Sequence, residues 1–133
     1  MVAVEITKQM EMVLYHSEQS DVTVNAIIKD ETIWITQKAM AELFGIDKSG
    51  ISRHLSNIFK SGELDEKVVV AKIATTTQHG AIEGKTQNSL TSYYNLDAII
   101  SVGYRVDSKQ ATQFRIWATN VLKEYMRKGF VMD

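Results

Sequence analysis

The spacing of hydrophobic residues changes along the chain, and this change separates predicted strands from predicted helices. Residues 12–15, 22–28 and 32–35 are rich in β-branched and aromatic side chains, which favours strands. The polar residues 29–31 lie between the second and third of these runs, where a hairpin turn would fall. The first part of the chain is therefore predicted to form a small antiparallel sheet.

From Thr36 onward the apolar positions follow the spacing of helices. The first predicted helix begins at Thr36, a plausible N-cap, and ends at Gly45, where glycine allows a left-handed cap. The second predicted helix begins at Asp47, also a plausible N-cap, and ends near Lys60. The pattern thus indicates two short helices joined by a tight glycine turn.

The remainder of the chain is predicted to form a hairpin followed by two helices. Residues 68–74 and 91–94 have the composition of strands, and a polar stretch separates them. Asn95 is placed to cap a helix that runs to about residue 102. An apolar stripe at helical spacing predicts a last helix over residues 108–127.

These elements describe an α+β fold, and the composition agrees with one globular domain. The chain has 133 residues, of which 44% are hydrophobic and 23% are charged, so it can bury roughly two-thirds of its unfolded surface. We expect a single domain over residues 1–133. In residues 10–94 we expect the small antiparallel sheet, a winged-helix-like helix-turn-helix and a hairpin wing, with a helical part over residues 95–133 packed on them.

The absence of cysteine indicates the compartment in which the protein works. It excludes disulfides and thiolate zinc sites, and it fits a reducing cytoplasm. No apolar run approaches the roughly 20 residues of a membrane helix, and the first residues lack the basic flank and apolar run of a signal peptide. We therefore expect a cytoplasmic protein with no membrane partner.

The charged residues are unevenly distributed. The net charge of −1 argues against a bulk electrostatic nucleic-acid binder. Residues 1–32 hold two basic and six acidic side chains, a net charge of −4. Residues 33–62 hold four basic and two acidic side chains, and residues 107–133 hold five and three, so each segment carries +2. A nucleic-acid contact is expected first in these two basic segments.

The predicted helix pair has the register of a helix-turn-helix. Ala41 supplies a small residue where the helices cross, and Gly45 follows four residues later in the turn. Ile46 closes the corner, and Ile51 points back into the pair. A second helix held in this way can lie in the major groove of DNA, which is about 12 Å wide.

Polar and basic residues remain on the outer side of this pair. Arg53 is the best candidate for reading a base, because its guanidinium can bond guanine O6 and N7 together. Lys48 and Ser49 lie at a helix N-terminus, which favours a phosphate, and the first residues of the first helix could clamp the neighbouring strand. The candidate DNA-binding residues are Thr36, Gln37, Lys38, Lys48, Ser49, Ser52, Arg53, Ser56 and Lys60.

Each of these interpretations has a structural alternative. The helix pair could be a packing unit or a dimerisation surface, since a net charge of +2 over thirty residues produces only a weak electrostatic field.

The polar hairpin over residues 75–88 could lie along the DNA backbone as a wing, or it could be a solvent loop. Residues 80–86 resemble a phosphate-binding loop, but three residues separate the glycines where four are required.

The sequence offers little for catalysis. His16, His54 and His79 are scattered and cannot form a paired metal site on a helix. Carboxylates cluster only over residues 63–66, which is typical of a solvated connector. We therefore expect no enzyme activity, no cofactor, no metal and no small-molecule substrate.

Six blocks of sequence together suggest a family, and all of them lie between residues 10 and 133. They are Ile33–Gln37, Met40–Ala41, Ile51–His54, Asn57–Lys60, Tyr93–Val106 and Thr112–Thr119. They resemble the RhuM family of bacterial virulence proteins, and the last block is more loosely similar to the Bro-N domains of viral and phage DNA-binding proteins. The resemblance implies DNA binding through the helix pair. Family members are usually longer, so it also implies that this chain is an N-terminal portion. The hairpin over residues 75–88 does not follow the family closely.

The leading prediction is sequence-specific binding of double-stranded DNA in transcriptional or mobile-element regulation. One recognition helix reads only a few base pairs, so we expect a homodimer on a two-fold site. The alternative is a protein–protein interaction module of a larger RhuM-like protein, without direct DNA contact. The near-neutral net charge supports this alternative.

Overall fold

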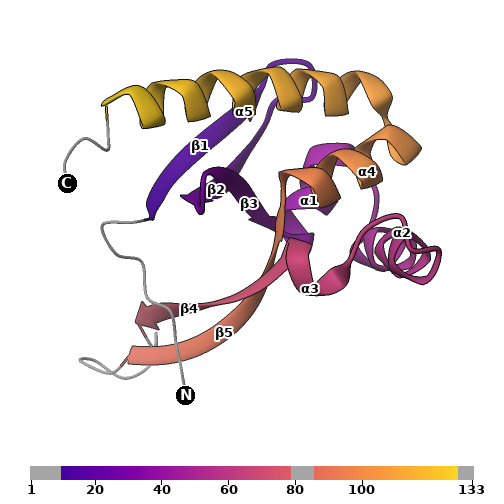
Figure 1. Ribbon diagram of the computed structural model, residues 1–133, viewed down its shortest axis with the longest axis horizontal. Coiled ribbons are helices and arrows are strands. Elements are labelled where there is room, and N and C mark those ends of the chain that lie inside the picture. The colour runs from indigo at the N-terminus through magenta and orange to yellow at the C-terminus, as the bar shows by residue number, and fades with distance from the viewer. Residues whose placement is uncertain (1–9, 79–85, 129–133) are drawn as a thin grey trace.

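The computed structural model describes residues 10–78 and 86–128 of the chain. They form an α+β fold, as predicted (Figure 1). The elements in chain order are β1 (Glu11–Ser17), β2 (Val22–Lys29), β3 (Thr32–Thr36), α1 (Gln37–Phe44), α2 (Lys48–Lys60), α3 (Glu66–Val69), β4 (Val70–Gln78), β5 (Thr86–Asn95), α4 (Leu96–Val106) and α5 (Ser108–Lys128).

The strands form one antiparallel sheet of five strands in the order β1-β2-β3-β5-β4. The predicted three-stranded sheet and the predicted hairpin are therefore parts of one sheet. The junction is the pairing of β3 with β5, in which Ile35 lies opposite Tyr94 and Thr36 lies opposite Tyr93. Local spacing along the chain contains no signal for this pairing, because the two strands are far apart in sequence.

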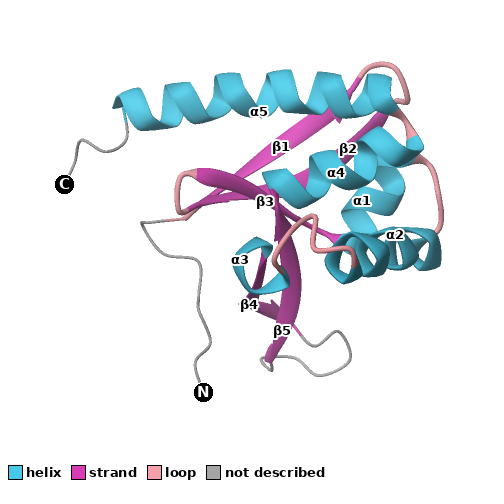
Figure 2. Ribbon diagram, turned by 45° about the vertical axis from the view of Figure 1, so that its right-hand side comes forward, coloured by secondary structure: helices cyan, strands magenta, loops and turns pink. Residues whose placement is uncertain are grey.

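Helices α1, α2, α4 and α5 gather on one side of strands β1 to β3, whereas α3 lies beside β4 and β5 (Figure 2). The strand residues that face them form the main core with residues from α1, α2, α4 and α5; Ile33 and Ile35, for example, are fully buried. The opposite face carries a smaller apolar cluster of Met10, Ile27 and Ile73. The sheet thus has a thickly covered face and a thinly covered one.

Two close contacts position the C-terminal helices. The ring of Phe114 in α5 lies 5.0 Å from the ring of Tyr15 in β1, measured between centroids, in an edge-to-face arrangement. In α4, Gly103 leaves no room for a side chain, because an added Cβ would lie 2.6 Å from the Phe44 ring and 2.7 Å from Cβ of Ala111. The fold therefore needs glycine where α4 crosses α1 and α5.

The structure also differs from the prediction in three local details. Helix α4 continues to Val106 rather than ending near residue 102. The predicted connector contains the short helix α3, which Asp65 caps by accepting a hydrogen bond of 3.0 Å from the amide of Lys67. The hairpin β4–β5 extends away from α2 in both views (Figures 1 and 2). The predicted wing over residues 75–88 is therefore not confirmed, and its central residues, 79–85, lie outside the described residues.

Candidate nucleic-acid interface

Helix α1 begins and ends where its capping residues predict. The hydroxyl of Thr36 accepts a hydrogen bond of 3.1 Å from the amide of Ala39 at the first turn. Gly45 has a φ of +72° in the left-handed region, and its amide donates to the carbonyl of Ala41 over 2.9 Å. A left-handed residue at this point costs least as glycine, so the chain turns sharply here.

Helix α2 begins at Asp47, whose carboxylate caps it. Oδ1 of Asp47 accepts a hydrogen bond of 2.9 Å from the amide of Gly50, and Oδ2 accepts one of 3.0 Å from the hydroxyl of Ser49. These bonds, with the nearby charge of Arg53, lower the pKa of Asp47 below its ordinary value. Asp47 therefore remains ionised at neutral pH and contributes a fixed negative charge at the start of α2.

The inner face of α2 is buried. Ile51, Leu55 and Ile58 are at most 2% exposed and pack into the main core. Ile46 in the turn is half-buried against the same core, as its predicted place in the corner requires. Phe59 is half-buried against the same core, and the exposed residues of α2 therefore lie on its opposite side.

The outer face of α2 and the start of α1 present exposed cations. Helix α2 lies at the periphery of the molecule, at the right of Figure 1. Within the described ranges, no carboxylate oxygen lies within 4.0 Å of the charged nitrogens of these cations, so none of them forms an ion pair. The exposed candidate residues are Lys38, Lys48, Ser49, Ser52, Arg53, Ser56 and Lys60.

Two other candidate residues are engaged inside the protein. The hydroxyl of Thr36 caps α1, and the side-chain amide of Gln37 donates a hydrogen bond of 2.9 Å to the hydroxyl of Tyr94 in β5. Both residues are half-buried. A contact with an external ligand would compete with these bonds, so Lys38 is the most available of the three candidates that open α1.

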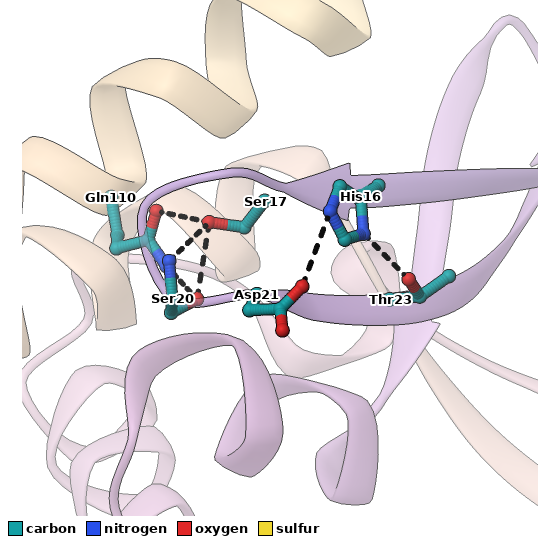
Figure 3. A network of polar contacts seen from close by, with 6 residues as sticks. All are labelled: His16, Ser17, Ser20, Asp21, Thr23 and Gln110. Atoms are coloured by element: carbon teal, nitrogen blue, oxygen red, sulfur yellow. Dashed lines mark hydrogen bonds and ion pairs between the residues drawn. The ribbon is translucent and has the colours of Figure 1, made fainter.

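A buried polar network holds the end of α1 (Figure 3). Gln110 of α5 donates to the carbonyl of Leu43 over 3.0 Å and to the hydroxyl of Ser20 over 3.0 Å. It also accepts a hydrogen bond of 3.0 Å from the hydroxyl of Ser17, and both Gln110 and Ser17 are at most 2% exposed. The network ties the helix pair to α5 and to the turn between β1 and β2. Helical spacing does not predict this network; its one signal in the sequence is an amide side chain next to the apolar stripe of α5.

The predicted carboxylate connector is also tied to the fold. Glu63 accepts hydrogen bonds from the hydroxyl of Ser101 over 3.0 Å and from the guanidinium of Arg105 over 2.5 Å. Both partners belong to α4, so the chain that leaves α2 is held against α4. Glu63 is therefore a structural contact as well as a surface residue.

The described part of the chain offers no candidate metal cluster or membrane-spanning helix, and His16 makes polar contacts there. No group of three or more histidine, aspartate or glutamate side chains is arranged to hold a metal ion there. No helix in that part is both long and apolar enough to cross a membrane. His16 lies at the exposed edge of β1, where its Nδ1 is 2.8 Å from the hydroxyl of Thr23 and its Nε2 is 3.6 Å from Asp21 in the turn between β1 and β2 (Figure 3).

The fold and the exposed helix define an α+β protein with exposed cations on α2. Comparison with protein families shows which family the C-terminal half of the chain resembles. Residues 68–133 match the model of the virulence protein RhuM family. The resemblance to this family is thereby confirmed, over a range that contains β4, β5, α4 and α5 and begins after α2. No curated protein and no solved structure matches the chain.

Proposed function

We propose that the chain binds double-stranded DNA through the outer face of α2. The observation that carries the proposal is that Lys48, Arg53 and Lys60 are exposed and have no ion-pair partner among the described residues, on a helix whose other face is buried. Free cations on a fixed helix can neutralise phosphates and release their counterions.

The residues have different roles in this proposal. Arg53 lies in the middle of the exposed face and reads a guanine from the major groove. Lys48 and Ser49 contact a phosphate at the start of α2, and Lys38 contacts the neighbouring backbone strand. Because one helix reads only a few base pairs, we expect specific binding to use a dimer on a two-fold site. The biological role of such binding would be transcriptional or mobile-element regulation.

The test uses duplexes selected from a random pool by the wild-type chain. In fluorescence anisotropy, Arg53→Ala is expected to lose about 1–3 kcal/mol of binding and to relax specificity at one position. Lys48→Ala is expected to weaken binding to all sequences and to lower the slope of log affinity against log salt by about one.

The matched control is Arg127→Ala in α5. Arg127 is also basic and exposed, but it is bonded to Glu124 over 2.6 Å. Its replacement is expected to leave both affinity and salt slope unchanged. Wild-type affinity and slope in both α2 variants would disprove the proposal.

The second candidate is a protein-interaction surface on the same helix face. The ionised carboxylate of Asp47 favours it, because a negative charge at the start of α2 opposes a phosphate there. Asp47→Asn keeps an oxygen that can cap α2 and removes the charge. Tighter DNA binding by this variant supports the DNA interface. If the chain instead retains a protein partner in a pull-down and does not shift the mobility of DNA in a gel, the interaction surface is supported.

A further inference from the structure

Strand β1 is an edge strand of the sheet in the described part of the chain. Among the described residues it pairs with β2 on one side and with no strand on the other. An edge strand presents a row of backbone amides and carbonyls that another extended chain can complete. The seven residues of β1 are enough for a full inter-strand ladder.

The side chains of β1 leave this edge without the usual protection. Met12 and Leu14 lie on the sheet face away from the helices and are 55% and 63% exposed. The strand contains no lysine, arginine or proline, the residues that commonly block edge-to-edge pairing. The opposite edge differs, because β4 carries the exposed Lys72. Among the described residues, the β1 edge therefore combines backbone groups that no strand pairs with exposed apolar side chains.

We propose that β1 pairs antiparallel with β1 of a second copy of this chain, which joins the two sheets into one. A two-fold axis at Leu14 places this residue opposite its own copy and Met12 opposite His16 of the second copy. On the helix-covered face it places Val13 opposite Tyr15 of the second copy, a β-branched residue beside an aromatic one, which stabilises antiparallel pairs.

Charge favours a second copy in this orientation. Glu11 is the only carboxylate of β1. Antiparallel pairing about Leu14 sets Glu11 opposite the neutral Ser17 of the second copy, so no two like charges face one another. Parallel pairing in register would instead bring the two Glu11 carboxylates together, which is destabilising.

An apolar groove extends the same surface. It lies between the start of β1 and the C-terminal half of α5 and has a volume of about 530 Å³. Its apolar lining includes Val13, Val121 and Tyr125, and Glu11 and Glu124 lie among its polar lining residues. A stable interface buries about 800 Å² per partner, more than one strand supplies. The groove provides apolar area beside the ladder for the second copy to cover.

The first test is disulfide cross-linking. The chain has no cysteine, so an introduced cysteine has no other thiol of the chain to react with. Leu14→Cys is expected to form a disulfide-linked dimer on mild oxidation without DNA, because opposed residues of antiparallel strands have Cα atoms about 4.5–5.5 Å apart, within disulfide reach. Asn25→Cys is the matched control: it lies on the same face, one strand inward. Its copies would be about 14 Å apart at the usual strand spacing, too far to bond.

The second test is the mass of the unmodified chain by light scattering and sedimentation over a concentration series. A dimer is expected, and Met12→Lys with Leu14→Lys should raise its dissociation constant by about tenfold or more, with unchanged circular dichroism. A wild-type monomer at all concentrations overturns the proposal, as does a dimer in which the Leu14→Cys variant cross-links no faster than the Asn25→Cys variant. Neither measurement includes DNA, so this failure is distinct from failure of the proposed function.

Discussion

The two basic segments of the chain have the same net charge but use it differently. In residues 33–62, Lys38, Lys48, Arg53 and Lys60 are exposed, and within the described structure none forms an ion pair. In the C-terminal segment, Arg127 is bonded to Glu124 and Arg115 donates to the hydroxyl of Tyr104. Lys109 and Lys123 are exposed and form no ion pair among the described residues. The two segments therefore differ in how many of their cations are engaged by the protein, although their net charges are equal.

The C-terminal segment acts instead as support for the helix pair. Helix α5 contributes the fully buried Phe114 to the core, and Gln110 bonds the end of α1. The match to the RhuM family covers this supporting part of the fold and not α1 or α2. Changes in the buried sides of α4 and α5 should therefore alter the free energy of unfolding, whereas changes on the exposed side of α2 should alter the proposed binding of DNA.

The largest effect is expected from Phe114→Ala. Phe114 is fully buried between Tyr15 and Trp117, so its loss should leave a cavity and lower the free energy of unfolding by about 3–5 kcal/mol. Urea denaturation measures this change. The control is Ile116→Ala, because Ile116 is 51% exposed two residues along the same helix and should cost about 0.5 kcal/mol or less. Equal losses in both variants would contradict the supporting role of the buried side of α5.

The next effect is expected from Gly103→Ala. Replacing an unconstrained glycine in a helix by alanine raises the free energy of unfolding by about 1 kcal/mol. At Gly103 the new methyl group would lie 2.6 Å from the Phe44 ring, so we expect a net loss of about 1–3 kcal/mol in unfolding free energy. Thermal and urea unfolding give the sign of the change. A stabilised variant would show that α4 does not hold α1 as closely as the structure indicates.

A smaller, pH-dependent effect is expected at Asp47. Its pKa is lowered in the folded protein, chiefly by the hydrogen bond from the amide of Gly50. The stabilisation is therefore full above the unfolded-state pKa of about 3.9 and is lost as the pH falls through the lower folded-state pKa. Unfolding of the wild type and Asp47→Asn, followed from pH 7 downward, should show the excess acid sensitivity only in the wild type. Parallel pH profiles would argue against the ionised cap.

The smallest effect is expected from Arg127→Ala. Its pair with Glu124 is exposed and spans three residues of one helix, and such pairs contribute about 0.5 kcal/mol or less. Urea denaturation at low and high salt should show a small loss that salt removes. A loss above about 1 kcal/mol would mean that this pair is more important to α5 than its exposure indicates.

The local parts of the fold could be predicted from the sequence. Thr36, Gly45 and Asp47 define the ends of α1 and α2 through caps that involve only neighbouring residues, and the structure confirms these caps. The burial of Ile51 followed from helical spacing in the same way. The candidate residues of α2 are exposed, as helical spacing predicted; they are Lys48, Ser49, Ser52, Arg53, Ser56 and Lys60.

The parts that depend on distant residues could not be predicted. The bond from Gln37 to Tyr94 removes a candidate side chain from free solvent, and it exists only because β5 lies beside β3. Likewise, Gln110 of α5 donates to the carbonyl of Leu43, which lies 67 residues earlier in the chain. Neither contact has a signature in spacing or propensity, since both partners are ordinary residues of their own elements.

The insertion of β5 beside β3 also bears on how the chain folds during synthesis. Strand β3 meets its second neighbour only after Tyr94 and Asn95 have been made, about sixty residues later. Until then a nascent chain carries β3 as an unfinished edge of the sheet, a state that is prone to aggregation. Formation of this central ladder is therefore expected to be the slow, late step of folding, because distant strands must find each other before they gain anything by pairing.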